Sequence, residues 1–229
     1  MHVSNKELKQ IFKDNDVEKI EEILSSKISE QDSICIIYWT LEYKNVDFHQ
    51  VIVNAILNGY LTINEKSLKL FRNYLGKKLL NKLIESDCLT SEQYFHLLVI
   101  IIERCITAGQ EKYEIKKVKE ILKKDIDLNY NNGILFKTAC EYRDPIILEL
   151  ILDSGFEVVY HNKYFIEGVR YLICYRKVNH LKILLKKGID LSFINNIKIE
   201  VQEKNRDLIN ILVDSGVELE NIIKLVIVK

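Results

Sequence analysis

The chain has 229 residues, of which 48% are hydrophobic, so it can bury a substantial core in one or two domains. Its 33 lysines and arginines balance 33 aspartates and glutamates, and this zero net charge argues against binding nucleic acid or an anionic membrane through a global field. One proline and eight glycines leave little material for long loops, Gly-rich phosphate cradles or sheets, so the composition indicates a nearly all-helical protein.

The five cysteines are widely spaced and form no C-x-x-C pair of the kind that serves metal or redox centres. We interpret them as free thiols in a reducing compartment. No apolar signal segment follows Met1, and the longest aliphatic run, residues 97–102, is far too short to cross a bilayer. The sequence therefore predicts a cytoplasmic protein that does not associate with a membrane.

The N-terminal part, residues 1–110, contains three weakly related helical runs, at residues 17–24, 51–59 and 79–87. They favour degenerate helical repeats over this part of the chain. The alternative is a separate helical domain built from ordinary amphipathic helices. Residues 90–105 predict a helix that is buried on most sides and opened by a Thr or Ser cap.

In residues 111–229 one sequence pattern recurs, which consists of an apolar helical run followed by a polar pair and a glycine. The three glycines are Gly155, Gly188 and Gly216, at separations of 33 and 28 residues, and a period in this range is typical of stacked helical hairpins. Glycine suits a helix end that needs a left-handed residue. Asp125 replaces it in an earlier copy, and the apolar end of the chain predicts a C-terminal cap.

These residues resemble the ankyrin repeat, which has a tight turn, an inner helix, an outer helix ending in Leu-Leu-x-x-Gly, and a finger loop. Residues 133–158 fit this pattern best, from Gly133 in the turn to Gly155 at the end of the outer helix. The family's Thr-Pro-Leu-His opening is absent from every copy, so the copies are degenerate. The resemblance implies an all-α solenoid of stacked helix-turn-helix repeats with short finger loops.

The same resemblance implies a non-enzymatic module that binds a partner protein through its concave face and finger loops. Eroded repeats rich in Ile, Lys and Asn are similar to the ankyrin proteins of large DNA viruses or intracellular bacteria. That similarity implies a host protein as partner and, for a viral protein, the host-cell cytoplasm as location.

No motif for catalysis or for cofactor binding is present. The five histidines never pair at helical spacing, and the glycines build neither a nucleotide-binding loop nor a nucleophile elbow. The sequence therefore predicts no catalytic residue, no metal site and no cofactor.

Candidate partner-binding residues emerge when the copies are aligned on their glycines, because equivalent positions of stacked repeats form columns. An aromatic column lies in the finger loops and could form part of a binding surface. The alternative is that these rings pack between adjacent fingers and serve only the stacking of the repeats. A basic column and two neighbouring registers predict a strip of cations and tyrosines that could bind an acidic or phosphorylated segment. The alternative interpretation of the basic column is a charged face that contacts only solvent. The candidates are Tyr130, Tyr160 and Phe193 in the fingers and Lys137, Arg170, Lys198, Tyr142, Tyr175, Arg143 and Arg176 in the strip.

Two other functions stay open from the sequence. A homo-oligomeric structural protein would dock its apolar tail on another copy, through Ile222, Ile223, Leu225, Val226 and Val228. A helical-repeat binder of nucleic acid is less favoured, because the chain carries no net positive charge.

Overall fold

A computed structural model describes residues 4–26, 28–43, 45–61, 77–85, 89–108, 111–196, 206–218 and 220–222 of the chain. All regular secondary structure within these ranges is helical, which confirms the all-α prediction for them. The chain divides into an N-terminal unit, Met1–Arg104 with Lys123–Ile126, and a C-terminal unit, Cys105–Leu122 with Asp127–Lys229. None of the helices in the described ranges is long and apolar enough to cross a membrane.

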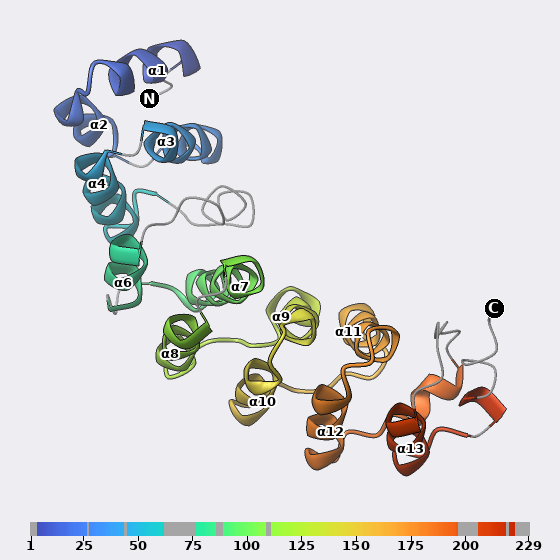
Figure 1. Cartoon of the computed structure of the whole chain (residues 1–229). Helices are drawn as coiled ribbons and strands as arrows, with labels where there is room; N and C mark the ends of the chain where they lie inside the picture. The colour runs from blue at the N-terminus through green and yellow to red at the C-terminus, as the bar shows by residue number, and fades with distance from the viewer. Residues whose placement is uncertain are drawn as a thin grey trace. The chain divides into compact units, whose positions relative to one another are not determined.

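The N-terminal unit begins with two helical hairpins that lie side by side (Figure 1). Helix α1 packs against α3 and α2 against α4, and α4 then contacts α6. Helices α2, α4 and α6 coincide with the three predicted runs. The helices are α1 (Asn5–Lys13), α2 (Val17–Ile23), α3 (Glu30–Tyr43), α4 (Val46–Leu57), α6 (Lys77–Glu85) and α7 (Ser91–Ala108).

Local sequence explains where the first helices begin and what holds the hairpins together. The Ser4 hydroxyl accepts a hydrogen bond from the Glu7 amide and the Asp16 carboxylate accepts one from the Lys19 amide, so each caps the amides of a helix start. Phe12 of α1 and Phe48 of α4 are almost completely buried, with ring centroids 4.6 Å apart. Their burial joins the two hairpins through one apolar core.

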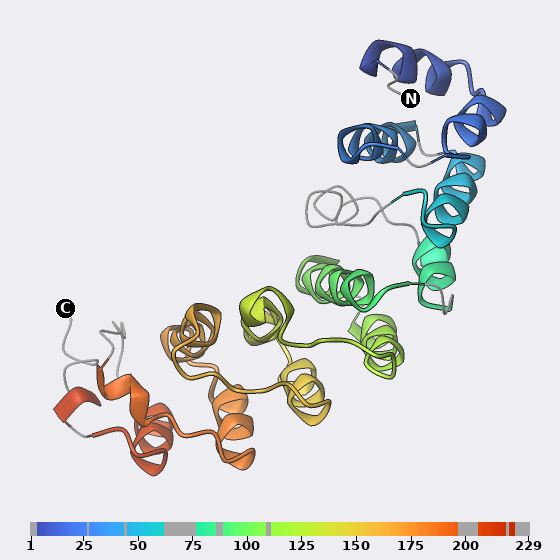
Figure 2. The ribbon, with the colours of Figure 1, turned by 180° about the vertical axis from the view of Figure 1, so that it is seen from behind.

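The C-terminal unit repeats the same hairpin arrangement (Figure 2). Helices α9 and α10 form one hairpin and α11 and α12 the next, with α9 packed along α11 and α10 against α12. Helix α8 contacts α10, and α13 contacts α12. The elements are α8 (Glu111–Ile121), α9 (Tyr130–Glu141), α10 (Ile146–Asp153), α11 (Lys163–Cys174), α12 (Val178–Lys186), the 3-10 helix η1 (Ser192–Asn196) and α13 (Arg206–Asp214).

The recurring glycines end the second helix of each hairpin as predicted. Helices α10, α12 and α13 each stop two residues before a glycine with a positive φ, of 95° at Gly155, 72° at Gly188 and 82° at Gly216. A side chain at these positions would be strained. The prediction that Asp125 plays the same role is wrong, because its φ is not positive and α8 already ends at Ile121, four residues earlier.

The two hairpins of the C-terminal unit approach closely where α9 meets α11. A Cβ atom added to Gly168 of α11 would lie 2.9 Å from a ring carbon of Phe136 and 3.1 Å from the Cys140 sulfur, both on α9. The Phe136 ring is buried, 5.5 Å from the Phe156 ring and 4.7 Å from the Phe165 ring. Gly168 therefore permits an aromatic core that adjacent hairpins share.

A buried histidine also connects the hairpins. The Nε2 atom of His180 on α12 lies 3.0 Å from the backbone oxygen of Tyr142, which follows α9. Because a carbonyl can only accept, this nitrogen carries the proton and donates. Burial lowers the pKa of His180, since the charged imidazolium is disfavoured in the interior.

Candidate partner-binding surface

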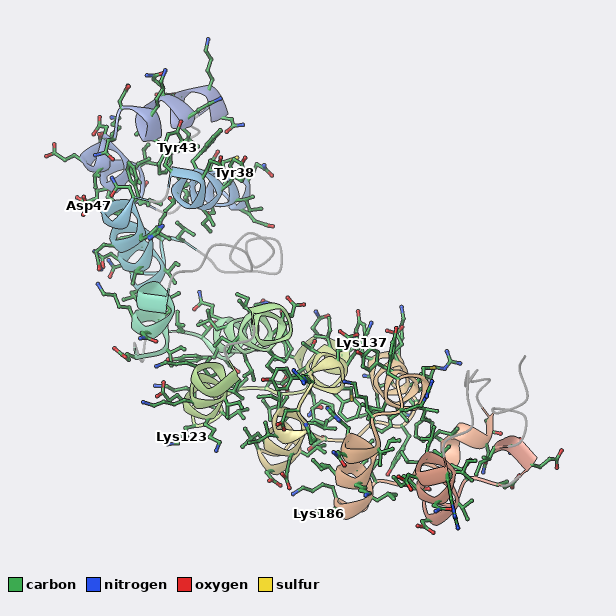
Figure 3. The ribbon with its side chains drawn as sticks, viewed as in Figure 1. Tyr38, Tyr43, Asp47, Lys123, Lys137 and Lys186 are labelled. Atoms are coloured by element: carbon green, nitrogen blue, oxygen red, sulfur yellow. The ribbon has the colours of Figure 1, made fainter. Side chains whose placement is uncertain are left out.

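The candidate surface is the solvent-facing side of the parallel helices α9 and α11. Pairs of residues 30 positions apart meet along this contact, because Lys137 bonds Glu167 and Glu141 acts electrostatically on Tyr171. The constant separation shows that the helices run in the same direction. Figure 3 shows Lys137 on this face, whereas Lys186 of α12 lies on the opposite face of the unit.

One row of side chains on α11 follows helical spacing and lines this face. Apart from the adjacent pair Arg170 and Tyr171, its members recur at intervals of three or four residues, which places them on one side of the helix. Gly168, Val169, Leu172 and Ile173 on the other side are buried. The row comprises Lys163, Glu167, Arg170, Tyr171 and Cys174, all exposed or half-buried.

Near the start of α11 the predicted cation Lys137 is paired with an acid. Its Nζ atom lies 2.8 Å from a carboxylate oxygen of Glu167, and Lys163 approaches the other oxygen at 3.8 Å. The hydrogen bond that Lys137 donates to Glu167 raises the pKa of Lys137, and the same bond lowers the pKa of Glu167. Lys137 also lies 5.8 Å from the Tyr164 ring centroid. Its charge is thus largely neutralised within the protein.

Near the end of α11 the surface is aromatic. Tyr171 and Tyr175 face each other with ring centroids 4.3 Å apart, and 65% of Tyr175 is exposed to solvent. Partial burial, with a smaller effect of the Glu141 carboxylate, raises the pKa of Tyr171, so this ring is a neutral phenol at physiological pH. The pair offers a rigid apolar area with polar tips.

The predicted arginines are near the aromatic pair in sequence or follow the neighbouring helix. Arg170 precedes Tyr171 on α11 and is exposed, while Arg176 follows Tyr175 and is half-buried. Arg143 is exposed and follows the end of α9. Their role in binding stays a prediction, and Tyr171 is an additional surface aromatic that glycine alignment did not provide.

Tyr142 was expected on this strip, in the same register as Tyr175, and that expectation is wrong. Its side chain is completely buried. The backbone explains the difference, because Tyr142 is extended with ψ of 148°, whereas Tyr175 stays close to helical with ψ of 11°. The extended residue turns the Tyr142 ring into the protein, where no partner can reach it.

The predicted finger aromatics pack against one another between adjacent repeats. The Tyr160 ring lies 5.7 Å from that of Phe165 and 5.9 Å from that of Phe193. The Tyr160 hydroxyl also accepts a hydrogen bond from the Asp190 amide, at 3.2 Å. These contacts favour the packing alternative, although 40% of Tyr160 stays exposed. Tyr130, the first residue of α9, is half-buried.

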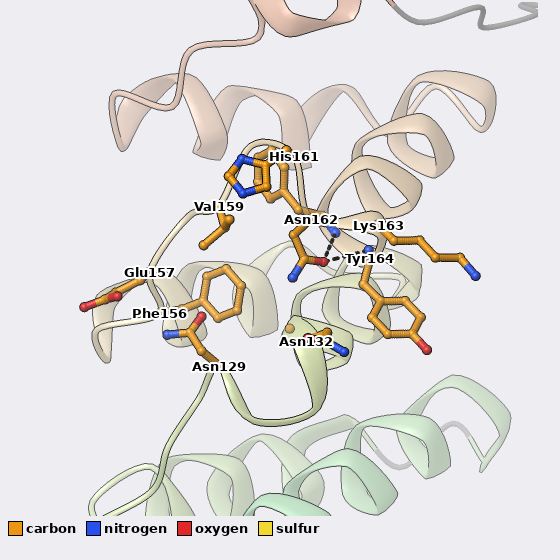
Figure 4. Close-up of a pocket in the computed structure, with 11 residues that line it drawn as sticks. Asn129, Asn132, Phe156, Glu157, Val159, His161, Asn162, Lys163 and Tyr164 are labelled. Carbon is orange, nitrogen blue, oxygen red and sulfur yellow. Dashed lines mark hydrogen bonds between the residues drawn. The ribbon is translucent and has the colours of Figure 1, made fainter.

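A pocket of about 570 Å³ lies between two fingers, beside the start of α11 (Figure 4). The Asn162 side-chain oxygen caps α11 by accepting from the amides of Tyr164 and Phe165. Phe156 forms an apolar wall, while Glu157 and Lys163 point outward on opposite sides. Such a mixture of amides and one aromatic wall can hold a peptide backbone with a small apolar side chain.

A run of left-handed residues at the start of α9 brings the backbone close to Phe156 and so forms one side of this pocket. Asn131, Asn132 and Gly133 are three consecutive left-handed residues, with φ of 53°, 55° and 74°. With its amide oriented toward the next finger, Asn129 donates to the Glu157 backbone oxygen at 3.0 Å and accepts from its amide at 3.2 Å. The sequence analysis missed this pocket, although the Asn-Asn-Gly run is a signal for a tight left-handed turn.

Other predicted residues lie outside the described ranges or are covered. Lys198, Ile223, Leu225, Val226 and Val228 are outside the described ranges. Ile222 is described and only 2% exposed, so this side chain packs within its own chain rather than facing a second copy. Among the described residues no cluster of three or more His, Cys, Asp or Glu side chains could hold a metal ion.

Comparison with known proteins gives one informative similarity. The chain is 25% identical over 118 residues to the putative ankyrin repeat protein R601 of Acanthamoeba polyphaga mimivirus, an alignment that covers 52% of this chain and 35% of that protein. The chain therefore matches about a third of the length of this relative. No protein-family model matches the sequence, and no solved structure matches it.

Proposed function

We propose that the chain is a degenerate ankyrin-like solenoid that binds a partner protein and has no catalytic activity. The similarity to a mimivirus ankyrin repeat protein supports this proposal. So do the paired hairpins of the C-terminal unit, whose second helices end before left-handed glycines at Gly155 and Gly188. On the same similarity we propose a host-cell protein as partner and the cytoplasm as the place of binding.

The observation that carries the proposal is the exposed aromatic pair at the end of α11. Tyr175 is 65% exposed and stacks on Tyr171, where an apolar side chain of a partner would gain contact at little entropic cost. Arg170 precedes Tyr171 and Arg176 follows Tyr175 in sequence, whereas Arg143 follows the end of the neighbouring helix α9. Tyrosine and arginine dominate the energetics of protein interfaces.

The distribution of charge assigns a direction to the bound segment. At the start of α11 Lys137 and Lys163 share the carboxylate of Glu167, which offsets one of their two charges. The arginines at the other end can each pair with a carboxylate or a phosphate in a bidentate manner. We therefore place the acidic part of the partner at the Tyr175 end and its uncharged part along Tyr164 and the pocket.

A photo-crosslinking experiment tests this assignment. A benzoylphenylalanine placed at Tyr175 and, separately, at Tyr164 is used in lysate of the host cell, and the crosslinked peptides are sequenced by mass spectrometry. We expect one protein to crosslink at both sites, through an acidic peptide at Tyr175 and a less charged neighbouring peptide at Tyr164. Crosslinks to unrelated proteins at the two sites would contradict a single bound segment.

Charge reversal supplies the matched control. Arg170→Glu with Arg176→Glu should reduce capture of that protein at least tenfold. Lys116→Glu with Lys182→Glu makes the same change of net charge on the exposed side of α8 and α12 and should leave capture unchanged. Equal loss in both double variants would mean that net charge, and not this surface, attracts the partner.

A further inference from the structure

A second exposed cluster of aromatic and basic side chains lies in the N-terminal unit, on α1 and α3. The Trp39 indole nitrogen donates a hydrogen bond to the Asn5 side-chain oxygen at 2.7 Å, which fixes the ring. The Tyr38 ring meets that of Trp39 edge-on at 5.0 Å, and 43% of Tyr38 is exposed. Figure 3 shows Tyr38 on α3, away from Asp47 at the start of α4.

A row of lysines borders this ring. Lys6, Lys9 and Lys13 are spaced by three and four residues, which places them on one face of α1, and all three are exposed. The Nζ atom of Lys9 lies 5.5 Å from the Trp39 ring centroid. The lysine face is therefore the one that adjoins the indole.

The acidic residues nearby leave this face positive. Glu7 and Asp14 each follow a lysine by one residue and so lie about 100° further around α1. The Asp14 carboxylate also accepts hydrogen bonds from the Gln10 amide at 2.8 and 2.9 Å. On α3, Glu42 is exposed one turn after Tyr38. Within the described part of α1, this face therefore carries three lysines, and the acidic residues next to them in sequence lie to one side of it.

Trp39 of this cluster and the neighbouring Tyr43, which is not part of the cluster, occupy the same register as the tyrosine pair of the C-terminal unit. Trp39 and Tyr43 precede the first residue of α4 by seven and three positions. Tyr171 and Tyr175 precede the first residue of α12 by the same numbers. Each unit therefore presents an aromatic pair one helical turn apart on the first helix of a hairpin.

We infer that Lys6, Lys9, Lys13, Tyr38 and Trp39 form a second docking surface, which takes an acidic protein segment carrying an aromatic or aliphatic side chain. The lysines supply charge complementarity, and the exposed edge of the Tyr38 and Trp39 pair supplies apolar contact. A short acidic peptide fits better than a nucleic acid, because the lysines occupy a single helix face and the chain as a whole carries no net positive charge to follow a phosphate backbone. The surface uses no residue of the C-terminal unit, so it stands or falls separately from the proposed function.

Fluorescence gives a direct test because Trp39 is the one tryptophan of the chain. Iodide and caesium quench exposed indoles, and a local positive potential concentrates the anion. Because iodide is intrinsically the stronger quencher, the ratio of iodide to caesium quenching is referred to that of N-acetyltryptophanamide. We expect the ratio for Trp39 at low ionic strength to be at least twice that of the free compound. Lys6→Glu with Lys13→Glu, which leaves the Lys9 contact intact, should bring the ratio below that of the free compound. A ratio in the parent chain equal to that of the free compound would overturn the assigned potential.

Peptide titration then tests the occupant. The probes are a twelve-residue peptide of glutamates with two phenylalanines, the same peptide with serines for phenylalanines, the same with lysines for glutamates, and a twelve-nucleotide oligothymidylate. We expect the peptide of glutamates and phenylalanines to shift Trp39 emission, with an affinity at least tenfold above that of the two other peptides and of the oligonucleotide. A stronger response to the oligonucleotide, or no response to the first peptide at millimolar concentration, would refute the inference.

Matched variants separate this surface from general charge effects. Lys6→Glu with Lys13→Glu should lower the affinity for the peptide of glutamates and phenylalanines at least fivefold. Lys82→Glu with Lys182→Glu carries the same change of net charge on α6 and α12 and should bind like the parent. Circular dichroism confirms that each variant is folded. Equal affinity of the two double variants would exclude the lysine face of α1.

Discussion

Arg176 adopts, in the turn between α11 and α12, the left-handed backbone conformation that Asn15 adopts in the turn between α1 and α2. Their φ angles are 52° and 58°. In both turns the left-handed residue donates its amide to the carbonyl three residues earlier, and the next amide donates to the carbonyl five residues before it. The first hairpin of the N-terminal unit and one of the C-terminal unit thus share one turn, although asparagine tolerates this conformation far better than arginine.

Arg176 should therefore show an unusual order of stability on substitution. We expect glycine or asparagine at position 176 to equal or exceed arginine in stability by up to about 1 kcal/mol, and valine to lose about 1–2 kcal/mol, because only the first two adopt a positive φ without strain. Urea unfolding measures the order. Arg143, whose φ is not positive, is the control, and glycine there should destabilise. Valine at 176 as stable as glycine would contradict the strain.

The helix that follows Arg176 lacks the cap that follows Asn15. Asp16 caps α2 through its carboxylate, whereas Lys177, with a similar backbone, makes no side-chain cap on α12. Lys177→Asp should raise stability by about 1 kcal/mol, because it supplies the missing acceptor. Thermal unfolding measures the gain. Lys177→Glu shares the charge but is too long to cap, so an equal gain from both would attribute the effect to the helix dipole alone.

Gly168→Ala should destabilise the C-terminal unit although alanine favours a helix. The new methyl would contact Phe136 and Cys140 at about 3 Å, and the Phe136 ring is held between other aromatic rings. We expect a net loss of about 1–3 kcal/mol in urea unfolding. Cys140→Ala makes room for the methyl, so the double variant should lose less than the sum of the single losses. Strict additivity would show that the clash is absent.

Acidification should destabilise the fold at His180, because protonation places a charge in the interior, and the hydrogen bond to the Tyr142 carbonyl offsets only part of that cost. Burial lowers the pKa of His180 below its ordinary value of 6.5, so the unfolded chain binds the proton more readily. The stabilisation is complete above pH 6.5 and is lost as the pH falls from there toward the folded pKa. Asp144 opposes this shift and Lys177 adds to it.

The measurement is the free energy of unfolding between pH 7.5 and 5. The parent should lose stability over this range, and His180→Gln should flatten the slope in part, because burial also lowers the pKa of His49 and gives a contribution of the same sign. An unchanged slope in His180→Gln would assign the pH dependence to other groups.

The sequence could predict those features that depend on a single local requirement. Gly155, Gly188 and Gly216 were recognised because a helix end in the left-handed region strongly favours glycine, and Arg170 and Tyr175 lie on the surface as their register predicted. The prediction that Tyr142 is exposed was wrong because its ψ angle differs from that of Tyr175. Aligning the copies by their distance from the glycines assumes that the turns between the helices have the same conformation.

Features that join two helices were not predictable in the same way. The column of cations placed Lys137 beside Arg170 in register, but its actual partner is Glu167, which belongs to another register of the next hairpin. The pocket between the fingers also depends on a left-handed run, Asn131 to Gly133, that brings the chain close to Phe156. Such contacts depend on how neighbouring repeats stack, and this cannot be predicted from the spacing of residues within one repeat.

The aromatic rings shared between hairpins determine how the C-terminal unit can come apart. Phe136 and Phe165 belong to neighbouring hairpins, and Phe193 of the following segment lies 5.5 Å from Phe165. Separating any one hairpin would expose rings of its neighbour to water, so each step of fraying from an end costs the burial of a whole interface between hairpins. A version shortened by one hairpin would therefore offer its bared rings to the nearest apolar surface.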